Sequence, residues 1–199
     1  MTGDTAALRG PLRKRDSHLW SRDQHDWYVE PVWCSARLFE IESFPAGLHD
    51  PACGMGRIVK AAQAAGIRAT GSDLVYRGKH DDFLVSDFLT DGNLVPNIVS
   101  NPPFGIAEHF VSHALNLAQY KVAMLLPANW VQGDKRSRWL AQTPLKCVYF
   151  LTPRPSMPPG DVIRVGGNPG NGTTDYAWFV WDRAHSGPAH IGWIRRDCA

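Results

Sequence analysis

The chain has 199 residues and a mass of 22.1 kDa, which is the size of one ordinary domain. Hydrophobic residues make up 44% and charged residues 20% of the sequence, which excludes a chain that is disordered by composition. No apolar run is long enough to predict a transmembrane helix. The 21 basic and 19 acidic residues give a net charge of +2, and this value alone excludes no class of partner.

The first residues lack the apolar core of a secretion signal. The four cysteines (Cys34, Cys53, Cys147 and Cys198) form no Cys-x-x-Cys pair. Both features favour a cytoplasmic protein with reduced thiols and argue against a disulfide framework or a zinc ribbon.

Residues 1–26 are polar and show no clear periodicity, so we expect an N-terminal arm followed by a single domain over 27–199. In that domain, helical spacing and composition predict helices over 32–44, 57–66, 106–120 and 134–144. Strands are predicted over 46–50, 67–74, 83–89, 97–104, 121–130, 147–153 and 175–183. The segment 154–174, rich in glycine and proline, is predicted to be a long loop.

Strands that alternate with helices predict an α/β fold with a mostly parallel, seven-stranded sheet and helices on both faces. The last two predicted strands can form an antiparallel pair at one edge. Ligands of such sheets bind beyond the carboxyl ends of the strands. Asp50, Asp73, Asp87 and Asn101 all fall at predicted strand ends, so we expect them to share one site.

The run DPACGMG, from Asp50 to Gly56, places an acid before a glycine turn that leads into a predicted helix. Glycine lets a backbone approach a ligand closely, although an ordinary tight turn has the same composition. The run lacks the Lys-Ser/Thr ending of a phosphate loop and the third glycine of the dinucleotide fingerprint. Asp73 follows where an acid can accept hydrogen bonds from both ribose hydroxyls, and Asp87 can accept one from an adenine amino group. Together they suggest an adenosine-containing cofactor, although each acid alone could be a cap or turn residue.

The tetrapeptide NPPF, Asn101 to Phe104, completes the pattern. With both motifs in this order, the chain resembles the S-adenosylmethionine-dependent amino-methyltransferases, especially the N6-adenine methyltransferases of nucleic acid, over roughly residues 28–182. The resemblance implies a Rossmann-like class I methyltransferase fold, with S-adenosylmethionine as cofactor and S-adenosylhomocysteine as product. The run WYVEPVW, from Trp27, resembles the family's additional N-terminal motif, which contacts the methionine part of the cofactor, but Glu30 stands where the family often has Thr. The resemblance makes Tyr28, Glu30 and Pro31 neighbours of the cofactor. The implied cofactor-binding residues are Tyr28, Pro31, Asp50, Pro51, Ala52, Cys53, Gly54, Gly56, Asp73, Leu74, Asp87, Phe88 and Asn101.

The resemblance also makes Asn101, Pro102, Pro103 and Phe104 the catalytic residues. An exocyclic adenine nitrogen is a poor nucleophile because its lone pair is delocalised into the ring. The Asn101 side-chain oxygen and the Pro102 carbonyl can each accept one amino hydrogen, which localises that lone pair. Pro103 fixes the turn, and Phe104 offers a flat face to a flipped base. The structural alternative is a proline-rich turn in which Asn101 is only a cap.

Only 27 residues separate Asp73 from Asn101, and about 17 follow the last predicted strand, so no separate target-recognition domain fits in either place. Weak sequence specificity, a very short site, a partner subunit or a substrate other than DNA would each account for this. Residues 121–164 carry seven basic and two acidic groups, which is a net charge of +5 and favours phosphate contact over a merely solvated face only mildly. Trp130 either lines the base pocket or packs in the core. Candidate substrate contacts are Trp130, Lys135, Arg136, Arg138, Arg154, Arg164 and, in the arm, Arg13, Lys14 and Arg15.

His109 and His113 have the spacing of metal ligands on a helix, but no HExxH motif and no third ligand accompany them, so we expect no metal. No cysteine follows a proline as a nucleophile would, outside the cofactor turn, which disfavours cytosine C5 methylation. The leading hypothesis is methylation of adenine N6 in DNA. Adenine in RNA, a protein side-chain amide, and a non-catalytic subunit that binds the cofactor remain as alternatives.

Overall fold

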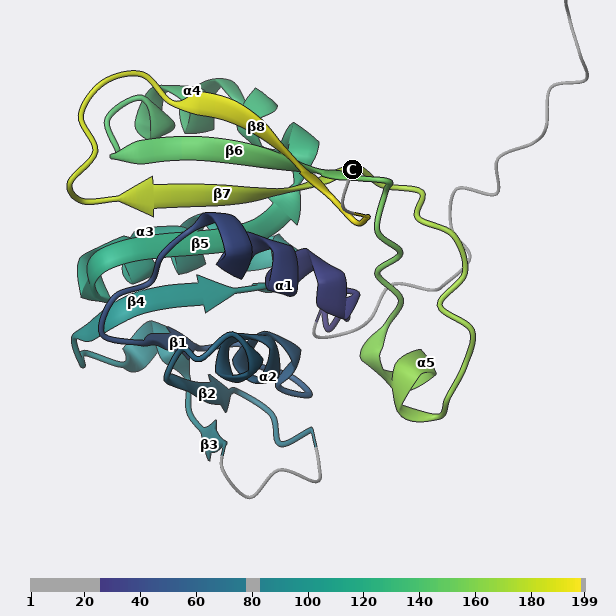
Figure 1. Ribbon diagram of the computed structural model, residues 1–199. Helices are drawn as coiled ribbons and strands as arrows, with labels where there is room; N and C mark the ends of the chain where they lie inside the picture. The colour runs from purple at the N-terminus through teal and green to yellow at the C-terminus, as the bar shows by residue number, and fades with distance from the viewer. Residues whose placement is uncertain (1–25, 78–82, 198–199) are drawn as a thin grey trace, which may run out of the picture.

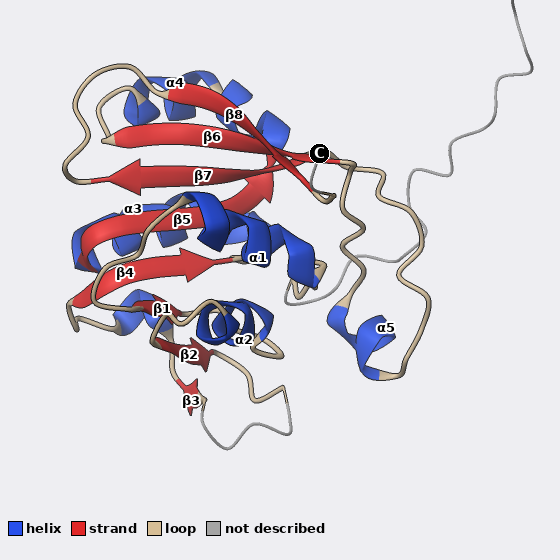
Figure 2. Ribbon diagram, viewed as in Figure 1, coloured by secondary structure: helices blue, strands red, loops and turns tan. Residues whose placement is uncertain are grey.

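A computed structural model describes residues 26–77 and 83–197 (Figure 1). The predicted arm therefore lies outside the described residues except for Asp26, and so do the candidate contacts Arg13, Lys14 and Arg15. Within the described residues, one sheet runs through the molecule and helices cover both of its faces (Figure 2). No helix in these residues is long and apolar enough to cross a membrane.

The sheet has the strand order β3-β2-β1-β4-β5-β7-β6-β8. The strands from β3 to β5 pair in parallel, whereas β7 runs antiparallel to both of its neighbours and β8 runs parallel to β6. This arrangement confirms the predicted α/β class and the mostly parallel sheet. The strand bounds are β1 (Leu48–Asp50), β2 (Ala69–Asp73), β3 (Leu84–Val85), β4 (Val95–Ser100), β5 (Ala118–Pro127), β6 (Leu145–Thr152), β7 (Tyr176–Asp182) and β8 (His190–Arg195).

The prediction of seven strands was wrong, because β8 adds an eighth at the edge beside β6. The predicted antiparallel pair exists as β6 and β7, but it is not at the edge. The sequence pattern for β8 is weak, because Gly192 interrupts it. In the structure, Ile191 and Trp193 are 64% and 65% exposed, so burial does not mark this strand either. Pairing with β6 along six residues, rather than local propensity, makes this segment a strand.

Two helices cover each face of the sheet (Figure 1). On one face lie α1 (Val32–Ile41) and α2 (Arg57–Ala64), and on the other α3 (Ala107–Leu117) and α4 (Asp134–Leu140). The predicted loop over 154–174 contains a further short helix, α5 (Gly160–Arg164), which stands beyond the strand ends. It has only five residues, and no apolar periodicity in the sequence marked it.

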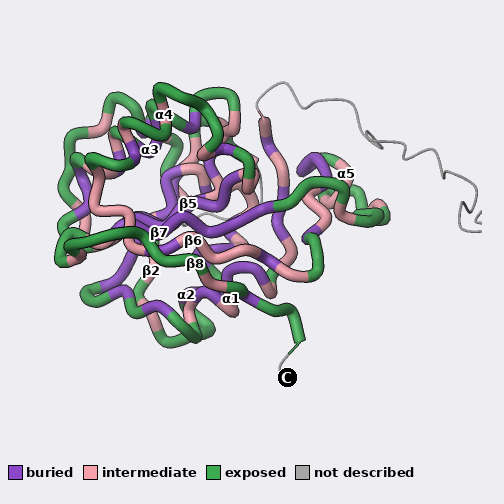
Figure 3. Tube along the Cα trace, turned by 90° about the horizontal axis from the view of Figure 1, so that it is seen from above, coloured by how far each residue is buried: buried purple, intermediate pink, exposed green. Residues whose placement is uncertain are grey.

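The core has two layers because β5 is buried on both faces, as its apolar run predicts. Met124 and Leu126 point into the layer under α3, whereas Ala123 and Leu125 point into the layer under α1 and α2. Figure 3 shows the central strands as the most buried part of the chain. A sheet buried on both sides is rigid, and it therefore holds its strand ends in fixed positions.

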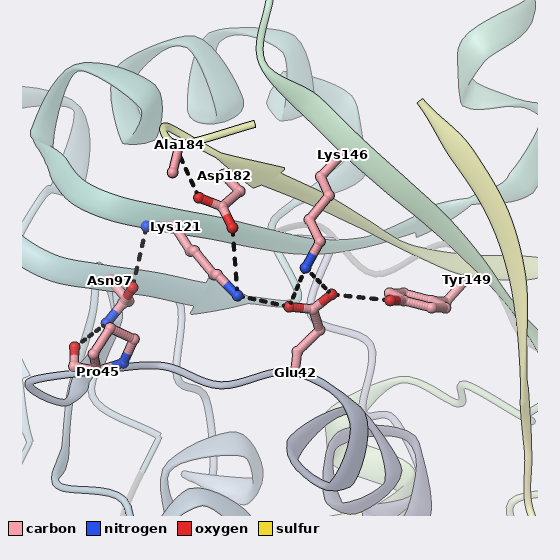
Figure 4. Close-up of polar contacts among 8 residues, drawn as sticks. All are labelled: Glu42, Pro45, Asn97, Lys121, Lys146, Tyr149, Asp182 and Ala184. Atoms are coloured by element: carbon pink, nitrogen blue, oxygen red, sulfur yellow. Dashed lines mark hydrogen bonds and ion pairs between the residues drawn. The ribbon is translucent and has the colours of Figure 1, made fainter. Parts of the chain in front are cut away.

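A buried ionic network ties α1 to the sheet at the amino-terminal end of β5 (Figure 4). The carboxylate of Glu42 accepts hydrogen bonds from the amines of Lys121 (2.7 Å) and Lys146 (2.8 Å) and from the hydroxyl of Tyr149 (2.9 Å). Lys121 also lies 3.5 Å from the carboxylate of Asp182. Residues from α1's end, β5, β6 and β7 thus share one cluster, far along β5 from the strand ends that carry the predicted site.

The carboxyl ends of the strands bring the predicted polar residues together. Asp50 is the last residue of β1, Asp73 is the last of β2, and Asn101 directly follows β4. Asp87 comes two residues after β3. Because these four strands are parallel and adjacent, their carboxyl ends lie at the same edge, which is where open α/β sheets bind ligands.

Candidate active site

A cavity of about 280 Å³ opens at this edge of the sheet. Its walls come from the segment before α1, the glycine turn after β1, and the ends of β2, β3 and β4. Twelve residues that the sequence analysis assigned to cofactor or catalysis line it: Tyr28, Asp50, Pro51, Ala52, Cys53, Gly54, Asp73, Leu74, Asp87, Phe88, Asn101 and Pro103. Four assigned residues, Pro31, Gly56, Pro102 and Phe104, are not among the lining residues.

The turn after β1 requires glycine at two positions. Gly54 and Gly56 have φ angles of +50° and +73°, in the left-handed region that glycine adopts without strain. A β-carbon on Gly54 would also lie 2.7 Å from Nε1 of Trp27. The turn therefore brings bare backbone against the cavity and ends at the start of α2.

Asp73 holds this turn in place. One of its carboxylate oxygens accepts the amide hydrogen of Gly54 (2.8 Å), and the other accepts that of Val75 (3.0 Å). Each carboxylate oxygen has a second lone pair, so both can still accept a hydroxyl from a ligand in the cavity. Asp87 accepts the amide hydrogen of Leu89 (3.0 Å) and also faces the cavity.

Asp50 is buried at the base of the cavity, where it accepts hydrogen bonds from the Ser100 hydroxyl (2.7 Å) and the Ala52 amide (3.2 Å). Burial raises the pKa of Asp50 well above its usual range, and the nearby carboxyl group of Glu30 raises it further, although the Ser100 hydrogen bond opposes the shift. Asp50 therefore cross-links the ends of β1 and β4, and this link fixes the spacing between the glycine turn and Asn101.

Asn101 is oriented by the segment that precedes α1. Its side-chain nitrogen donates to the carbonyl oxygen of Tyr28 (2.8 Å) and to the carboxylate of Glu30 (2.9 Å). A backbone carbonyl can only accept hydrogen bonds, so the side-chain nitrogen, and not the oxygen, must face Tyr28. The other polar atom, Oδ1, is buried and has no hydrogen-bond partner. The cavity wall thus contains an unsatisfied acceptor on the first residue of NPPF.

The segment before α1 lines the cavity and is hydrogen-bonded to the loop that carries α5. The amide of Val29 donates to the Pro158 carbonyl (3.0 Å), and the amide of Gly160 donates to the Trp27 carbonyl (2.9 Å). The carboxylate of Asp26 accepts the amide hydrogen of Gly105 (2.8 Å), next to NPPF. We call residues 26–30 the strap.

The cavity wall also contains charged and aromatic residues that the analysis of the sequence did not assign, among them Asp26, Trp27, Arg57 and Arg77. Asp26 and Trp27 belong to the strap, Arg57 begins α2, and Arg77 follows β2. The Arg77 guanidinium lies 4.4 Å from the centroid of the Trp27 ring. Trp27 could have been included as the first residue of the WYVEPVW run, but nothing in the sequence places the two arginines beside it.

Phe104 lies next to the cavity rather than in its wall. Its ring stacks on Tyr28 at 5.8 Å between centroids with an interplanar angle of 8°, and it lies 5.7 Å from the ring of Tyr176. Tyr28 does line the cavity. The aromatic ring that lines the cavity is therefore that of Tyr28, and Phe104 stacks on it from outside the wall.

The predicted substrate contacts of the second half do not line the cavity. Trp130 is buried and packs edge-on against Phe179 and Trp139, which agrees with the core alternative for this residue. Lys135 is exposed on α4. The four arginines are each paired with a carboxylate: Arg136 with Glu108, Arg138 with Asp134, Arg154 with Asp175 and Arg164 with Asp161.

No group of three or more His, Cys, Asp or Glu side chains is arranged to hold a metal ion within residues 26–77 and 83–197. His109 is exposed on α3. The Nε2 atom of His113 lies 2.9 Å from the Asp91 carbonyl and the ring packs edge-on against Phe88. The two histidines therefore have separate surroundings.

The fold is similar to that of solved structures of methyltransferases. The chain aligns with a protein from Listeria monocytogenes assigned as a class I S-adenosylmethionine-dependent methyltransferase (TM-score 0.57, 13% identity, 87% of this chain and 67% of that one). It also aligns with the magnesium protoporphyrin IX methyltransferase of Synechocystis PCC 6803, solved with bound S-adenosylmethionine (TM-score 0.51, 16% identity, 75% of this chain and 76% of that one).

A third similar structure is a modification subunit assigned to a type I restriction enzyme from Vibrio vulnificus YJ016 (TM-score 0.55, 13% identity, 84% of this chain). This chain spans 46% of that subunit. No protein-family model and no curated protein matches the sequence. The likeness is one of structure at low identity, and it shows that the chain has the fold of the class I S-adenosylmethionine-dependent methyltransferases.

Proposed function

We propose that this chain is an S-adenosylmethionine-dependent methyltransferase that methylates the exocyclic N6 of adenine, in DNA. The observation that carries the proposal is the orientation of Asn101. Its side-chain nitrogen is fully engaged by the strap, and its side-chain oxygen is buried in the cavity wall without a partner. A buried acceptor without a partner is unfavourable, and an amino hydrogen of the substrate would satisfy it.

The cavity fits the proposed cofactor. Five carboxyl groups line it (Asp26, Glu30, Asp50, Asp73 and Asp87), against two guanidinium groups (Arg57 and Arg77). When bound, S-adenosylmethionine supplies a methyl group on a positively charged sulfur. Asp26, Asp73 and Asp87 outnumber the two guanidinium groups even without the buried Asp50 and Glu30, whose pKa values burial raises, and this excess suits that charge. The glycine turn offers bare backbone, and Asp73 and Asp87 offer acceptors for ribose hydroxyls and an adenine amino group. Leu74 and Phe88 supply apolar wall on either side.

The chain's own residues would prepare the amine for transfer. Asn101 Oδ1 would accept one amino hydrogen, and the Pro102 carbonyl would accept the other, which localises the nitrogen lone pair. Both acceptors belong to one rigid turn that directly follows β4, so they are preorganised before the substrate arrives. The stacked rings of Tyr28 and Phe104 offer flat faces for a base that has left its helix.

Nucleic acid is proposed ahead of protein because of the net positive charge of residues 121–164. DNA is proposed ahead of RNA because of the likeness to a modification subunit of a restriction enzyme. Arg138, Arg154 and Arg164 are engaged in exposed ion pairs, which are weak and can exchange a carboxylate for a phosphate. The described residues contain no separate target-recognition domain. Recognition of a target sequence would therefore come from outside these residues, or the specificity is low.

The test combines the purified protein, labelled S-adenosylmethionine and, in parallel, unmethylated genomic DNA, cellular RNA and a protein extract. Mass spectrometry of the digested products identifies the methylated group. N6-methyldeoxyadenosine supports the proposal, N6-methyladenosine moves the substrate to RNA, and a methylated side-chain amide moves it to protein. Tight cofactor binding without transfer to any of the three polymers would contradict the enzymatic proposal.

Asn101→Ala is expected to reduce transfer by roughly 100-fold, the effect of removing one preorganised hydrogen-bonding group from an active site. Affinity for S-adenosylhomocysteine, measured by calorimetry, should stay within about threefold, because the variant keeps the glycine turn and the carboxylates. Asn116→Ala is the matched control, since Asn116 is exposed on α3, and it should behave as the unaltered protein. Full activity of Asn101→Ala would show that the reaction does not depend on this amide.

A further inference from the structure

Glu30 is a buried acid at an unusual place. Its exposed fraction is 5%, and it is the last residue of the strap before Pro31 and α1. Its carboxylate accepts a hydrogen bond from the side-chain nitrogen of Asn101 at 2.9 Å. Burying a carboxyl group lowers the free energy of unfolding unless the group is paired, so a buried acid at this position needs an explanation.

The backbone of Glu30 is fixed independently of its side chain. Arg57, at the start of α2, donates from its guanidinium to the Glu30 carbonyl (2.7 Å). The neighbouring Val29 is bonded to Pro158, in the loop that carries α5. The carboxyl group therefore projects from an anchored backbone, and its position relative to Asn101 is set by two separate parts of the fold.

The contact decides which way the Asn101 amide faces. One oxygen of the Glu30 carboxyl group accepts a hydrogen bond from the Asn101 nitrogen, so together with the Tyr28 carbonyl it binds both hydrogens of that nitrogen. Turning the amide over would place its oxygen against two acceptors. We propose that Glu30 is a positioning residue that locks the Asn101 amide with Oδ1 free to accept a hydrogen from the substrate amine. The proposal rests on the proposed function and extends it by one residue.

The carboxylate also strengthens the acceptor that it positions. A hydrogen bond from the amide nitrogen to Glu30 favours the resonance form with more negative charge on Oδ1, since hydrogen bonds in a chain polarise one another. Burial raises the pKa of Glu30, and the hydrogen bond from Asn101 and the charge of Arg57 oppose that rise. An amine that receives a methyl group becomes more positive, and its hydrogen bond to Oδ1 strengthens as it does so. Glu30 would therefore act on the rate of transfer and have little effect on binding of the cofactor.

A double-mutant cycle on the full chain tests this assignment. The variants are Glu30→Ala, Asn101→Ala and the double variant, with Glu30→Gln as the isosteric change. We expect Glu30→Ala to lower kcat roughly 10- to 100-fold, the range for a lost hydrogen bond to a charged group. Affinity for S-adenosylhomocysteine and KM for unmethylated genomic DNA should stay within about threefold. Glu30→Gln should retain more activity than Glu30→Ala, because its carbonyl can still accept.

The double variant separates positioning from a general structural effect. If Glu30 acts through Asn101, the double variant has the same kcat as Asn101→Ala to within about threefold. The proposal would be overturned if the loss of kcat in the double variant equalled the product of the losses in the two single variants. It would also be overturned if Glu30→Ala left kcat unchanged. Glu40→Gln is the control, because Glu40 is an exposed acid of α1 whose partner is Arg37. It should keep full activity.

A second readout does not depend on activity. With asparagine labelled by ¹⁵N, the Asn101 side-chain amide should show hydrogens shifted downfield by the carboxylate and exchanging slowly with water. Glu30→Ala should move that signal, and Glu40→Gln should leave it in place. An amide signal that is the same with and without Glu30 would refute the assignment. Absence of methyl transfer by the unaltered protein would instead refute the proposed function, and the amide signal would still decide the role of Glu30.

Discussion

Asp73 combines two tasks within one carboxylate. It accepts the amides of Gly54 and Val75, so it shapes the glycine turn, and it faces the cavity. The sequence indicated only the second task, through the distance from the glycine run. The first became visible with the structure, because Gly54 is 19 residues away along the chain.

Replacing Asp73 should weaken cofactor binding. We expect Asp73→Ala to reduce the affinity for S-adenosylhomocysteine roughly 10- to 100-fold, because charge-assisted hydrogen bonds to the ligand and to the turn are both lost. Calorimetric titration measures the change. Asp91→Asn is the matched control, since Asp91 also caps a turn, by accepting the amide of Asn93, but does not line the cavity. Equal affinity of Asp73→Ala and Asp91→Asn would remove Asp73 from the binding site.

At the scale of elements, the strap depends on the loop that carries α5. Trp27 lies between the glycine turn and Gly160, and a β-carbon on Gly160 would overlap its indole ring. The strap also carries the two acceptors that orient Asn101. The loop over 154–174 thus acts on the site through the strap, although its own arginines do not line the cavity.

Gly160→Ala is therefore expected to disturb both stability and binding. Alanine has a higher helix propensity than glycine, so propensity alone predicts no loss of stability. Overlap with Trp27 should instead lower the free energy of unfolding by about 1–3 kcal/mol and weaken binding of S-adenosylhomocysteine. Urea unfolding and calorimetry measure the two effects. Gly92→Ala is the control, because a β-carbon there meets open space. An unfolding midpoint shared by both variants would show that the strap tolerates displacement of Trp27.

At the scale of the whole molecule, Glu42 connects the end of α1 to two strands, β5 and β6 (Figure 4). Burial acts to raise the pKa of Glu42, but the hydrogen bonds from Lys121, Lys146 and Tyr149 outweigh it and leave the pKa below its ordinary value. Its charged form is therefore favoured in the folded state. The network lies at the other end of β5 from the cavity, so it bears on stability and not on the chemistry.

The stabilisation by Glu42 should depend on pH. Because the folded pKa is depressed, the contribution is fully present above the ordinary value of 4.5 and is lost as the pH falls through the folded value. Glu42→Gln should cost about 2–3 kcal/mol of unfolding free energy at pH 7, and the difference from the unaltered protein should shrink in acid. Glu40→Gln removes an exposed ion pair on the same helix and should change stability by less than about 1 kcal/mol. A difference for Glu42→Gln that is constant from pH 7 to pH 3 would contradict this account.

Local sequence patterns were enough to predict the α/β class and the edge of the sheet at which Asp50, Asp73 and Asn101 lie. Alternating strands and helices predict a mostly parallel sheet, and these polar residues stand at the carboxyl ends of strands. The glycine turn is equally local, because two positive φ angles demand glycine.

The tertiary structure alone decided how Asn101 is presented. Its hydrogen bonds reach 71 and 73 residues back along the chain, to Glu30 and Tyr28, and no local pattern carries such a contact. The same holds for β8, which is a strand because β6 offers it an edge, and for Arg57 and Arg77, which the fold brings beside the strap. Strand pairing and burial between distant segments depend on how the whole chain packs. In NPPF, that packing engages the Asn101 side-chain nitrogen and leaves its oxygen without a partner.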